Sequence, residues 1–310
     1  MEKSREPQRM KPHRSPAQIS VEAEAWLKNA CEQVSTDRSI AEQRQYNYTN
    51  SLPISEKALK HHKITTSEIE INGVPCLVLN PFERKKNRTI LYIFGGGFTV
   101  GSPLEDIPIS ASLAAKTGAQ VISPAYRLAP EHPFPAALDD IATVARQIFT
   151  NDHNACIAGE SAGANLALGV MHRLRQANLP MPQAAAFLSP PTDKTMRDDS
   201  FNLGRDPTLK PARIKQIEDA YIGDHDRSNP EISPIYGAFD AHFPPSIITT
   251  GTRDLLLSSS IRLARVMREA GMVVDLRVWE GMWHVFEYYP EIPEADASLT
   301  EIAAFLERHF

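Results

Sequence analysis

The segment Ala158-Gly159-Glu160-Ser161-Ala162-Gly163-Ala164-Asn165 places a serine between two glycines, one two residues before it and one two residues after it. An apolar run at 155–158 precedes the serine turn, and an Ala/Leu-rich stretch at 162–176 follows it. A serine on a sharp turn from strand to helix exposes its hydroxyl, and the flanking glycines let the neighbouring chain approach closely. A chance Gly-x-Ser-x-Gly in a loop would lack this context, so the pattern predicts that Ser161 is a nucleophile.

Short apolar runs recur on both sides of this segment, at 89–94, 120–123, 155–158, 184–188, 246–250 and 273–278. Helix-like stretches separate most of them, for example 135–149, 162–176 and 259–270. Such an alternation predicts an α/β protein with a mostly parallel sheet covered by helices on both faces. Alternating runs at 64–71 and 74–79 flank Asn72-Gly73, which is a strong two-residue hairpin signal, so an antiparallel pair should open the sheet.

A nucleophilic serine needs a general base, and the histidines that follow it are His172, His225, His242, His284 and His309. His284 comes just after the last predicted strand, where a loop would lie over the edge of the sheet. His172 falls in a predicted helix and is expected at the surface, whereas the others lie in polar connections or beside the C-terminus. We therefore predict that His284 is the base and that activity rises with pH near the ordinary histidine pKa of about 6.5.

The base in turn needs a carboxylate, which should follow the strand before the histidine loop. Asp254 directly follows the run 246–250 and a glycine turn, and it is the predicted acid. Asp240 precedes that strand and Asp275 lies inside the next one, so both are badly placed. Asp193 follows an earlier strand and remains the alternative.

Three successive glycines follow the predicted strand 89–94, in Phe94-Gly95-Gly96-Gly97-Phe98. Backbone N–H groups of Gly95, Gly96 and Gly97, together with that of Ala162, are predicted to stabilise an oxyanion. A phosphate-binding loop is the weaker alternative, because the glycines follow neither phosphate-loop spacing. The side chains expected to contact a substrate are those of Phe98, Glu160, Asn165 and Phe201.

The composition narrows the class of protein. The 310 residues are 42% hydrophobic, enough for one large core, and a net charge of −5 gives no reason to expect nucleic acid as a partner. No apolar run approaches the roughly 18 residues that span a membrane, and the polar N-terminus does not read as a signal peptide. The three cysteines are scattered, which indicates a reducing, cytoplasmic location with Cys76 and Cys156 in the core; no Cys/His cluster has metal-binding spacing.

We expect the chain to be organised in two parts. Residues 1–50 would form a tail, mobile over 1–16, and cap helices, because apolar residues around Trp26 recur at helical spacing. Residues 51–310 would form the catalytic domain. The interval between the runs 184–188 and 246–250 is too long for a simple crossover, so a second cap segment is expected at about 192–225.

Together these motifs resemble the hormone-sensitive-lipase-like branch of the α/β-hydrolases. The likeness runs from about residue 64 to the C-terminus, through Gly95–Phe98, Tyr126–Ala137 with Asp139 and Asp140, Gly159–Gly163, Gly251–Asp254 and the surroundings of His284. It implies the α/β-hydrolase fold, with an eight-stranded sheet, one antiparallel strand and a helical cap. It also implies carboxylesterase activity on a small-molecule ester without metal or organic cofactor, and homodimers are common in that family. Arg127 and the acidic residues near it would pin loops beside the site.

Two positions depart from the family pattern. Phe94 stands where a histidine usually precedes the glycines, so packing rather than a hydrogen bond should support the glycine loop. Leu255, Leu256 and Leu257 follow the predicted acid, where Pro-Leu and a further Asp are common, so apolar contacts replace charged ones. Neither change removes a predicted catalytic group. The alternatives are a lactone, carbamate or amide hydrolase with the same three residues, or a ligand-binding receptor on this fold.

Overall fold

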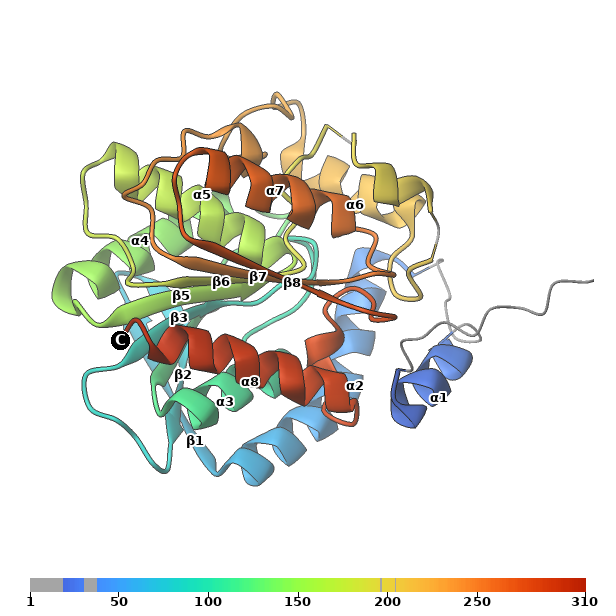
Figure 1. Cartoon of the computed structure of the whole chain (residues 1–310), viewed down its shortest axis with the longest axis horizontal. Helices are drawn as coiled ribbons and strands as arrows, with labels where there is room; N and C mark the ends of the chain where they lie inside the picture. The colour runs from blue at the N-terminus through green and yellow to red at the C-terminus, as the bar shows by residue number, and fades with distance from the viewer. Residues whose placement is uncertain (1–18, 31–37, 196, 204) are drawn as a thin grey trace, which may run out of the picture.

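One eight-stranded sheet runs through the molecule in the order β1-β2-β4-β3-β5-β6-β7-β8 (Figure 1). The computed structural model describes residues 19–30, 38–195, 197–203 and 205–310. The strands are β1 (Ile64–Ile71), β2 (Val74–Pro81), β3 (Thr89–Ile93), β4 (Gln120–Pro124), β5 (Ala155–Glu160), β6 (Ala185–Leu188), β7 (Ser246–Gly251) and β8 (Val274–Trp279). β2 is antiparallel to both of its neighbours, and all other pairs are parallel. The α/β-hydrolase sheet predicted from the sequence is confirmed.

The local signals explain this sheet. Asn72 and Gly73 have φ of 49° and 86°, the left-handed region that a two-residue hairpin turn requires, and they join β1 to β2 as predicted. The central strands β3, β5, β6 and β7 are buried along their whole length, because helices cover both faces. That is why their sequences are continuous apolar runs rather than alternating ones.

The helices are α1 (Val21–Ala30), α2 (Ile40–His62), α3 (Ile107–Thr117), α4 (Ala136–Asn151), α5 (Ala162–Gln176), α6 (Pro211–Ile222), α7 (Leu257–Glu269) and α8 (Pro293–Glu307). Short 3₁₀ turns are η1 (Asp199–Asn202), η2 (Pro234–Tyr236) and η3 (Phe286–Tyr288). In Figure 1, α4, α5 and α7 lie along one face of the sheet, and α3 and α8 lie along the other. Helix α2 and the long connection that carries η1 and α6 lie over the carboxyl ends of the parallel strands.

Helix α2 begins at a well-formed cap and is longer than the sequence suggests. Ser39 accepts a hydrogen bond from the Glu42 N–H, and the Glu42 side chain accepts one from the Ser39 N–H in return, which satisfies two otherwise unpaired donors. The helix then continues to His62, so the expected boundary at residue 50 falls inside one continuous helix.

The predicted core cysteines are buried, whereas one histidine does not lie where the sequence placed it. Cys76 and Cys156 lie in the core as predicted, whereas Cys31 and the tail 1–16 lie outside the described residues. The prediction that His172 lies at the surface is wrong: its side chain is buried, with Nε2 3.1 Å from the Pro234 carbonyl oxygen. The reason is that the segment after η2 folds back over α5 and packs Phe239 and Phe243 against the imidazole ring.

Candidate active site

Ser161 stands at the sharp turn between β5 and α5. Its φ of 48° and ψ of −121° lie outside the regions that ordinary residues occupy, at a cost of about 1–3 kcal/mol that the surrounding structure must offset. The Ser161 N–H donates to the Leu188 carbonyl oxygen at 2.9 Å, which ties the turn to β6. A Cβ on Gly163 would overlap the carbonyl oxygens of Ile93 and Phe94, so the turn can lie against β3 only with glycine there. The predicted serine turn is therefore present, with its hydroxyl at the carboxyl end of the sheet.

The three residues predicted as nucleophile, base and acid meet at that edge. His284 Nε2 lies 2.9 Å from Ser161 Oγ, and His284 Nδ1 lies 3.2 Å from Asp254 Oδ1. An ionised carboxylate can only accept hydrogen bonds, so Nδ1 carries the proton and donates to Asp254. Nε2 is then left to accept from the serine hydroxyl, the arrangement that general-base catalysis requires.

Asp254 is held as an ionised group. Thr250 Oγ1 donates to its Oδ2 at 2.8 Å, and the Leu256 N–H donates to its Oδ1 at 2.8 Å. Complete burial acts to raise the pKa of this carboxyl, but the His284 charge and the hydrogen bonds outweigh burial and hold the pKa below its usual range. Asp254 therefore stays negative beside the imidazole.

Asp206 is a functional candidate that the sequence did not reveal. It lies in the connection between β6 and β7, and its buried Oδ2 accepts from the Leu255 N–H at 2.9 Å and from the His284 N–H at 3.3 Å. Burial and the nearby Asp254 charge raise its pKa. The Asp206 carboxyl group thus joins the loop that follows Asp254, with its apolar residues, to the loop that carries His284. It belongs to no catalytic motif and lies 49 residues from Leu255, so no spacing along the chain signals this contact.

The competing carboxylates have other partners. Asp193, the alternative acid, pairs with Arg262 at 2.8 Å and accepts from the Tyr236 hydroxyl at 3.0 Å. Asp240 pairs with Arg175, and Asp275 pairs with Arg277. Of the aspartates weighed from the sequence, Asp254 alone has a hydrogen bond to His284 within the described part of the chain.

The three glycines form the loop between β3 and α3. Gly96 and Gly97 have φ of 102° and 62°, and the Gly96 carbonyl oxygen accepts from the N–H groups of Thr99 and Val100 at 3.2 and 3.1 Å. The Gly95 N–H donates to the Glu160 carboxyl. Within the described residues the N–H groups of Gly96 and Gly97 have no backbone acceptor, so these two are free for another acceptor. The glycines and Ala162 line the same cavity as Ser161.

Aromatic side chains support the loop. The Phe94 ring stacks on Tyr126 with centroids 4.2 Å apart, and the Phe98 ring stacks on Tyr221 at 3.9 Å. The Tyr126 hydroxyl also donates to the Phe94 carbonyl oxygen at 2.9 Å. Phe94 thus packs as the sequence predicts, and Tyr126 supplies a hydrogen bond to the loop backbone. Close by, Arg127 pairs with Asp140 at 2.8 Å and fixes the connection that carries Tyr126.

Buried acids lie under the glycine loop. The Glu160 carboxyl lies against Gly95, where a Cβ would overlap it. Burial and the charge of Asp106 raise the pKa of Glu160 to about 8. Burial raises the pKa of Asp106 to about 7, although the Tyr92 hydroxyl donates to it at 2.6 Å. Both groups are therefore partly protonated near neutral pH, which lessens the negative charge beside the loop.

A cavity of about 540 Å³ contains Ser161 and His284. The predicted contact residues Phe98 and Glu160 line it, whereas Asn165 and Phe201 lie outside its lining. The Asn165 side-chain amide donates to the carbonyl oxygens of Pro191 and Ile232 at 2.7 and 3.0 Å, because it faces the connection after β6 rather than the cavity. Phe201 lies in η1, half-buried and away from the cavity wall.

The cavity roof comes from α2 and from the connection that carries α6. Gln43, Tyr46 and Asn47 of α2 line it, and so do Ile214 and Ile217 of α6. The Trp26 segment, expected over the site, instead docks beside α8: Trp26 stacks on Trp283 with centroids 3.9 Å apart, and Ser20 Oγ donates to Glu294 at 2.8 Å. Its apolar face is therefore buried against the histidine loop and not against the cavity.

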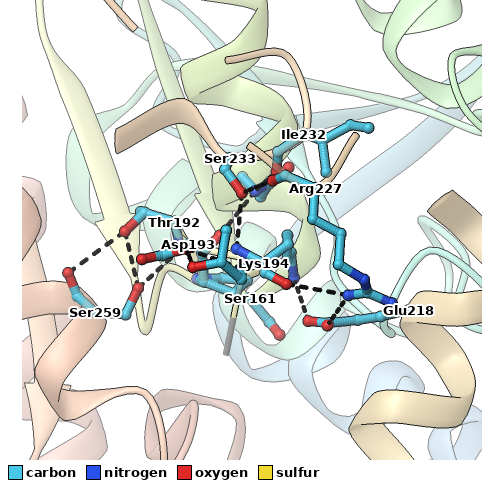
Figure 2. A network of polar contacts seen from close by, with 12 residues as sticks. Ser161, Thr192, Asp193, Lys194, Glu218, Arg227, Ile232, Ser233 and Ser259 are labelled. Atoms are coloured by element: carbon cyan, nitrogen blue, oxygen red, sulfur yellow. Dashed lines mark hydrogen bonds and ion pairs between the residues drawn. The ribbon is translucent and has the colours of Figure 1, made fainter. Parts of the chain in front are cut away.

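A buried ion pair joins α6 to the loop after β6 (Figure 2). Lys194 Nζ lies 2.9 Å from Glu218 Oε1, and both side chains are about 95% buried. Arg227 donates to Glu218 Oε2 at 3.1 Å and to the Lys194 carbonyl oxygen at 3.0 Å, and Ser233 Oγ accepts from the Lys194 N–H at 2.7 Å. This network fixes the cap helix close to Ser161.

The described residues contain neither a metal-binding cluster nor a membrane-spanning helix. No group of three or more His, Cys, Asp or Glu side chains there is arranged to hold a metal ion. Within the same residues, no helix combines the length and apolar character needed to span a membrane.

Known proteins share this fold. Residues 90–288 match the α/β-hydrolase fold family. An acetyl-hydrolase of Streptomyces hygroscopicus is 32% identical over 229 residues, 72% of this chain and 76% of that protein. An esterase of Acinetobacter venetianus is 33% identical over 223 residues, 70% of this chain and 73% of the esterase. The crystal structure of a hormone-sensitive lipase from a metagenome library superposes with a TM-score of 0.87 and 30% identity, over 94% of this chain and 99% of the lipase. With its serine turn, glycine loop and histidine loop at one edge of this sheet, the chain belongs to the α/β-hydrolase fold family, in its branch of hormone-sensitive-lipase-like esterases.

Proposed function

We propose that the protein hydrolyses carboxylic esters of small to medium acyl chains by two-step acyl transfer through Ser161. The observation that supports this most strongly is the hydrogen-bonded chain Ser161–His284–Asp254 inside a cavity of about 540 Å³. The relatives named as an acetyl-hydrolase and an esterase favour the same substrate class.

In the first step, His284 Nε2 takes the proton of the Ser161 hydroxyl while Oγ attacks the ester carbonyl carbon. The carbonyl oxygen becomes an oxyanion, for which Gly96, Gly97 and Ala162 offer backbone N–H groups, with Gly95 at the entry of the loop. Loss of one such donor typically costs about 2.7–4 kcal/mol of barrier. The imidazolium then gives its proton to the leaving alcohol, and the acyl group stays on Ser161.

In the second step, water takes the place of the alcohol. His284 accepts a proton from the water as it attacks the acyl carbon, and it returns that proton to Ser161 Oγ as the carboxylic acid leaves. Asp254 keeps the imidazole in the tautomer with the proton on Nδ1 and stabilises its cationic form in both steps. Each step uses only side chains and N–H groups that line the cavity or touch His284.

The test measures hydrolysis of 4-nitrophenyl acetate and butyrate by three variants. Ser161→Ala and His284→Ala should each lower kcat by about 10⁴-fold or more, and Asp254→Asn should lower it by roughly 10⁴-fold because the imidazole tautomer is lost. Circular dichroism should show an unchanged fold. Turnover by Ser161→Ala within tenfold of the parent would refute the proposal, and a damaging Asp193→Asn beside a harmless Asp254→Asn would show that the acid is Asp193.

A further inference from the structure

One wall of the cavity is cationic. Lys210 and Arg213, at the start of α6, line the cavity, and Arg38, just before α2, lines it as well. All three are half-buried. Within the described residues neither Lys210 nor Arg213 forms an ion pair; Arg213 Nη1 donates to the uncharged Gln216 side chain at 2.8 Å, and the Arg38 guanidinium lies 3.9 Å from the Tyr46 ring centroid.

The helix sets how far along its axis these residues lie from the glycine loop. Ile217, on the same helix, contacts the glycine loop: its Cγ2 lies 2.6 Å from where a Gly97 Cβ would be. Arg213 lies four residues before Ile217, so their Cα atoms are about 6 Å apart along the axis of α6. Lys210 is the extended residue that directly precedes the helix. Both side chains line the cavity at least one turn beyond the residue that contacts the glycine loop, a position that suits the far end of a short substrate.

The acids of the cavity do not cancel this charge. Glu218 is already paired with Lys194 and Arg227. Burial and the charge of Asp106 raise the pKa of Glu160 to about 8, and burial raises the pKa of Asp106 to about 7. Both carboxyl groups are therefore partly protonated at neutral pH. Burial also raises the pKa of Glu105. Glu160, Asp106 and Glu105 come from the end of β5 and from the segment before α3, and none of them comes from the start of α6.

We propose that the cavity prefers esters that carry a second, anionic group, such as a carboxylate, several bonds from the scissile carbonyl, with Arg213 and Lys210 binding that group. This inference rests on the proposed ester hydrolysis and narrows its substrate class. A guanidinium suits a carboxylate because it offers parallel N–H donors in one plane, and Lys210 adds a second charge just before the helix. The anion can belong to the acyl part or to the alcohol part of the ester, and each source has its own test.

The acyl source is tested by comparing mono-4-nitrophenyl glutarate with 4-nitrophenyl pentanoate, which differ by a carboxylate in place of the terminal methyl group. The alcohol source is tested with 3-carboxyphenyl butyrate against phenyl butyrate. The measured quantity is the ratio of kcat/KM for the anionic ester to that for the neutral ester. In at least one pair we expect a ratio well above one that falls as salt is added, because salt screens the attraction.

Two variants and one control test whether Arg213 and Lys210 cause the preference for the anionic ester. Arg213→Gln, alone or with Lys210→Gln, should lower the ratio by roughly tenfold, the usual size of a lost hydrogen bond to a charged group. Lys215→Gln removes the same charge from the same helix, but Lys215 is exposed, paired with Asp219 and outside the cavity, so the ratio should not change. A parent ratio at or below one in both pairs, or a ratio that Arg213→Gln leaves unchanged, would overturn the inference.

A binding measurement tests the preference for an anionic ester independently of hydrolysis. Calorimetric titration of the Ser161→Ala protein with monoethyl glutarate and with ethyl pentanoate measures the same preference without turnover. Tighter binding of the anion, lost in Ser161→Ala with Arg213→Gln, supports the inference even if hydrolysis is absent. Equal binding of the two esters would contradict it, whereas failure of hydrolysis alone would count only against the proposed function.

Discussion

The imidazole of His284 is influenced by two carboxyl groups. Asp254 accepts from Nδ1, and Asp206 accepts from the backbone N–H of the same residue. Burial opposes the charged imidazole, but the charges of Asp254 and Asp206 outweigh burial and raise the pKa of His284 above its ordinary value. The sequence alone suggested an ordinary pKa of about 6.5. The upward direction comes from Asp254 and Asp206, which together outweigh burial, and no motif shows the contribution of Asp206.

The raised pKa of His284 sets the acid limb of the pH profile of activity. Only the neutral imidazole can accept the serine proton, so activity is lost as pH falls through the His284 pKa. We expect the acid limb of kcat/KM for 4-nitrophenyl acetate to have its midpoint above about pH 6.5. Asp206→Asn keeps an oxygen acceptor but removes a negative charge, so it should move the midpoint to lower pH. A parent midpoint at or below 6.5, or one that Asp206→Asn moves upward, would contradict this assignment.

Glu160 sets the alkaline limb of the pH profile of activity. Its pKa is raised to about 8, so above that pH it becomes a carboxylate against Gly95, beside the place where the oxyanion develops. A like charge there raises the barrier, and kcat should decline as pH rises through about 8. Glu160→Gln has nearly the same shape and cannot ionise, so its profile should stay level on the alkaline side. A parent rate that is level up to pH 10, measured with correction for spontaneous hydrolysis, would show that Glu160 does not act in this way.

Helix α2 is tied directly to the glycine loop. Arg44 Nε donates to the Thr99 carbonyl oxygen at 2.7 Å, and Nη2 donates to that of Ala129 at 2.8 Å. Thr99 in turn donates its N–H to Gly96, and the Ala129 N–H donates to Phe98. The helix that roofs the cavity therefore holds both sides of the glycine loop in place.

Arg44→Gln should lower kcat by roughly tenfold, less than the 10²–10³-fold loss of a whole oxyanion donor, because the donors remain and only their support weakens. The matched control is Glu131→Gln: Glu131 pairs with the same guanidinium, at 2.8 Å, but does not touch the loop. This variant should keep most of the parent kcat. If Arg44→Gln changes only the melting temperature or KM while kcat is unaffected, Arg44 merely anchors the helix.

Across the whole molecule, the sequence predicts the elements whose pattern follows from their surroundings. β3, β5, β6 and β7 are buried on both faces and are therefore apolar throughout, and Asn72-Gly73 is a turn that few other residues could form. The order of Ser161, Asp254 and His284 along the chain was also sufficient to select the residues that meet in space.

The features that could not be predicted from the sequence depend on contacts between distant segments. Helix α3 is buried on nearly every side, so it lacks the periodicity that marks a surface helix. His172 is covered by a connection more than sixty residues later, and Asp206 reaches two loops that no spacing rule relates to it. Trp26 does have an apolar face, but amphipathic character cannot tell which surface buries that face; in the structure it is Trp283.

The proposed mechanism requires a covalent bond between Ser161 and the acyl group, and this intermediate can be trapped. The protein is mixed with 4-nitrophenyl butyrate, quenched in acid within milliseconds to seconds, digested and analysed by mass spectrometry. We predict one butyryl group on the peptide that contains Ser161, formed with a burst of nitrophenol equal to the enzyme concentration, and no such adduct on the Ser161→Ala protein. An acyl group on another residue, or continued hydrolysis by Ser161→Ala at the parent rate without any adduct, would show that Ser161 is not the nucleophile.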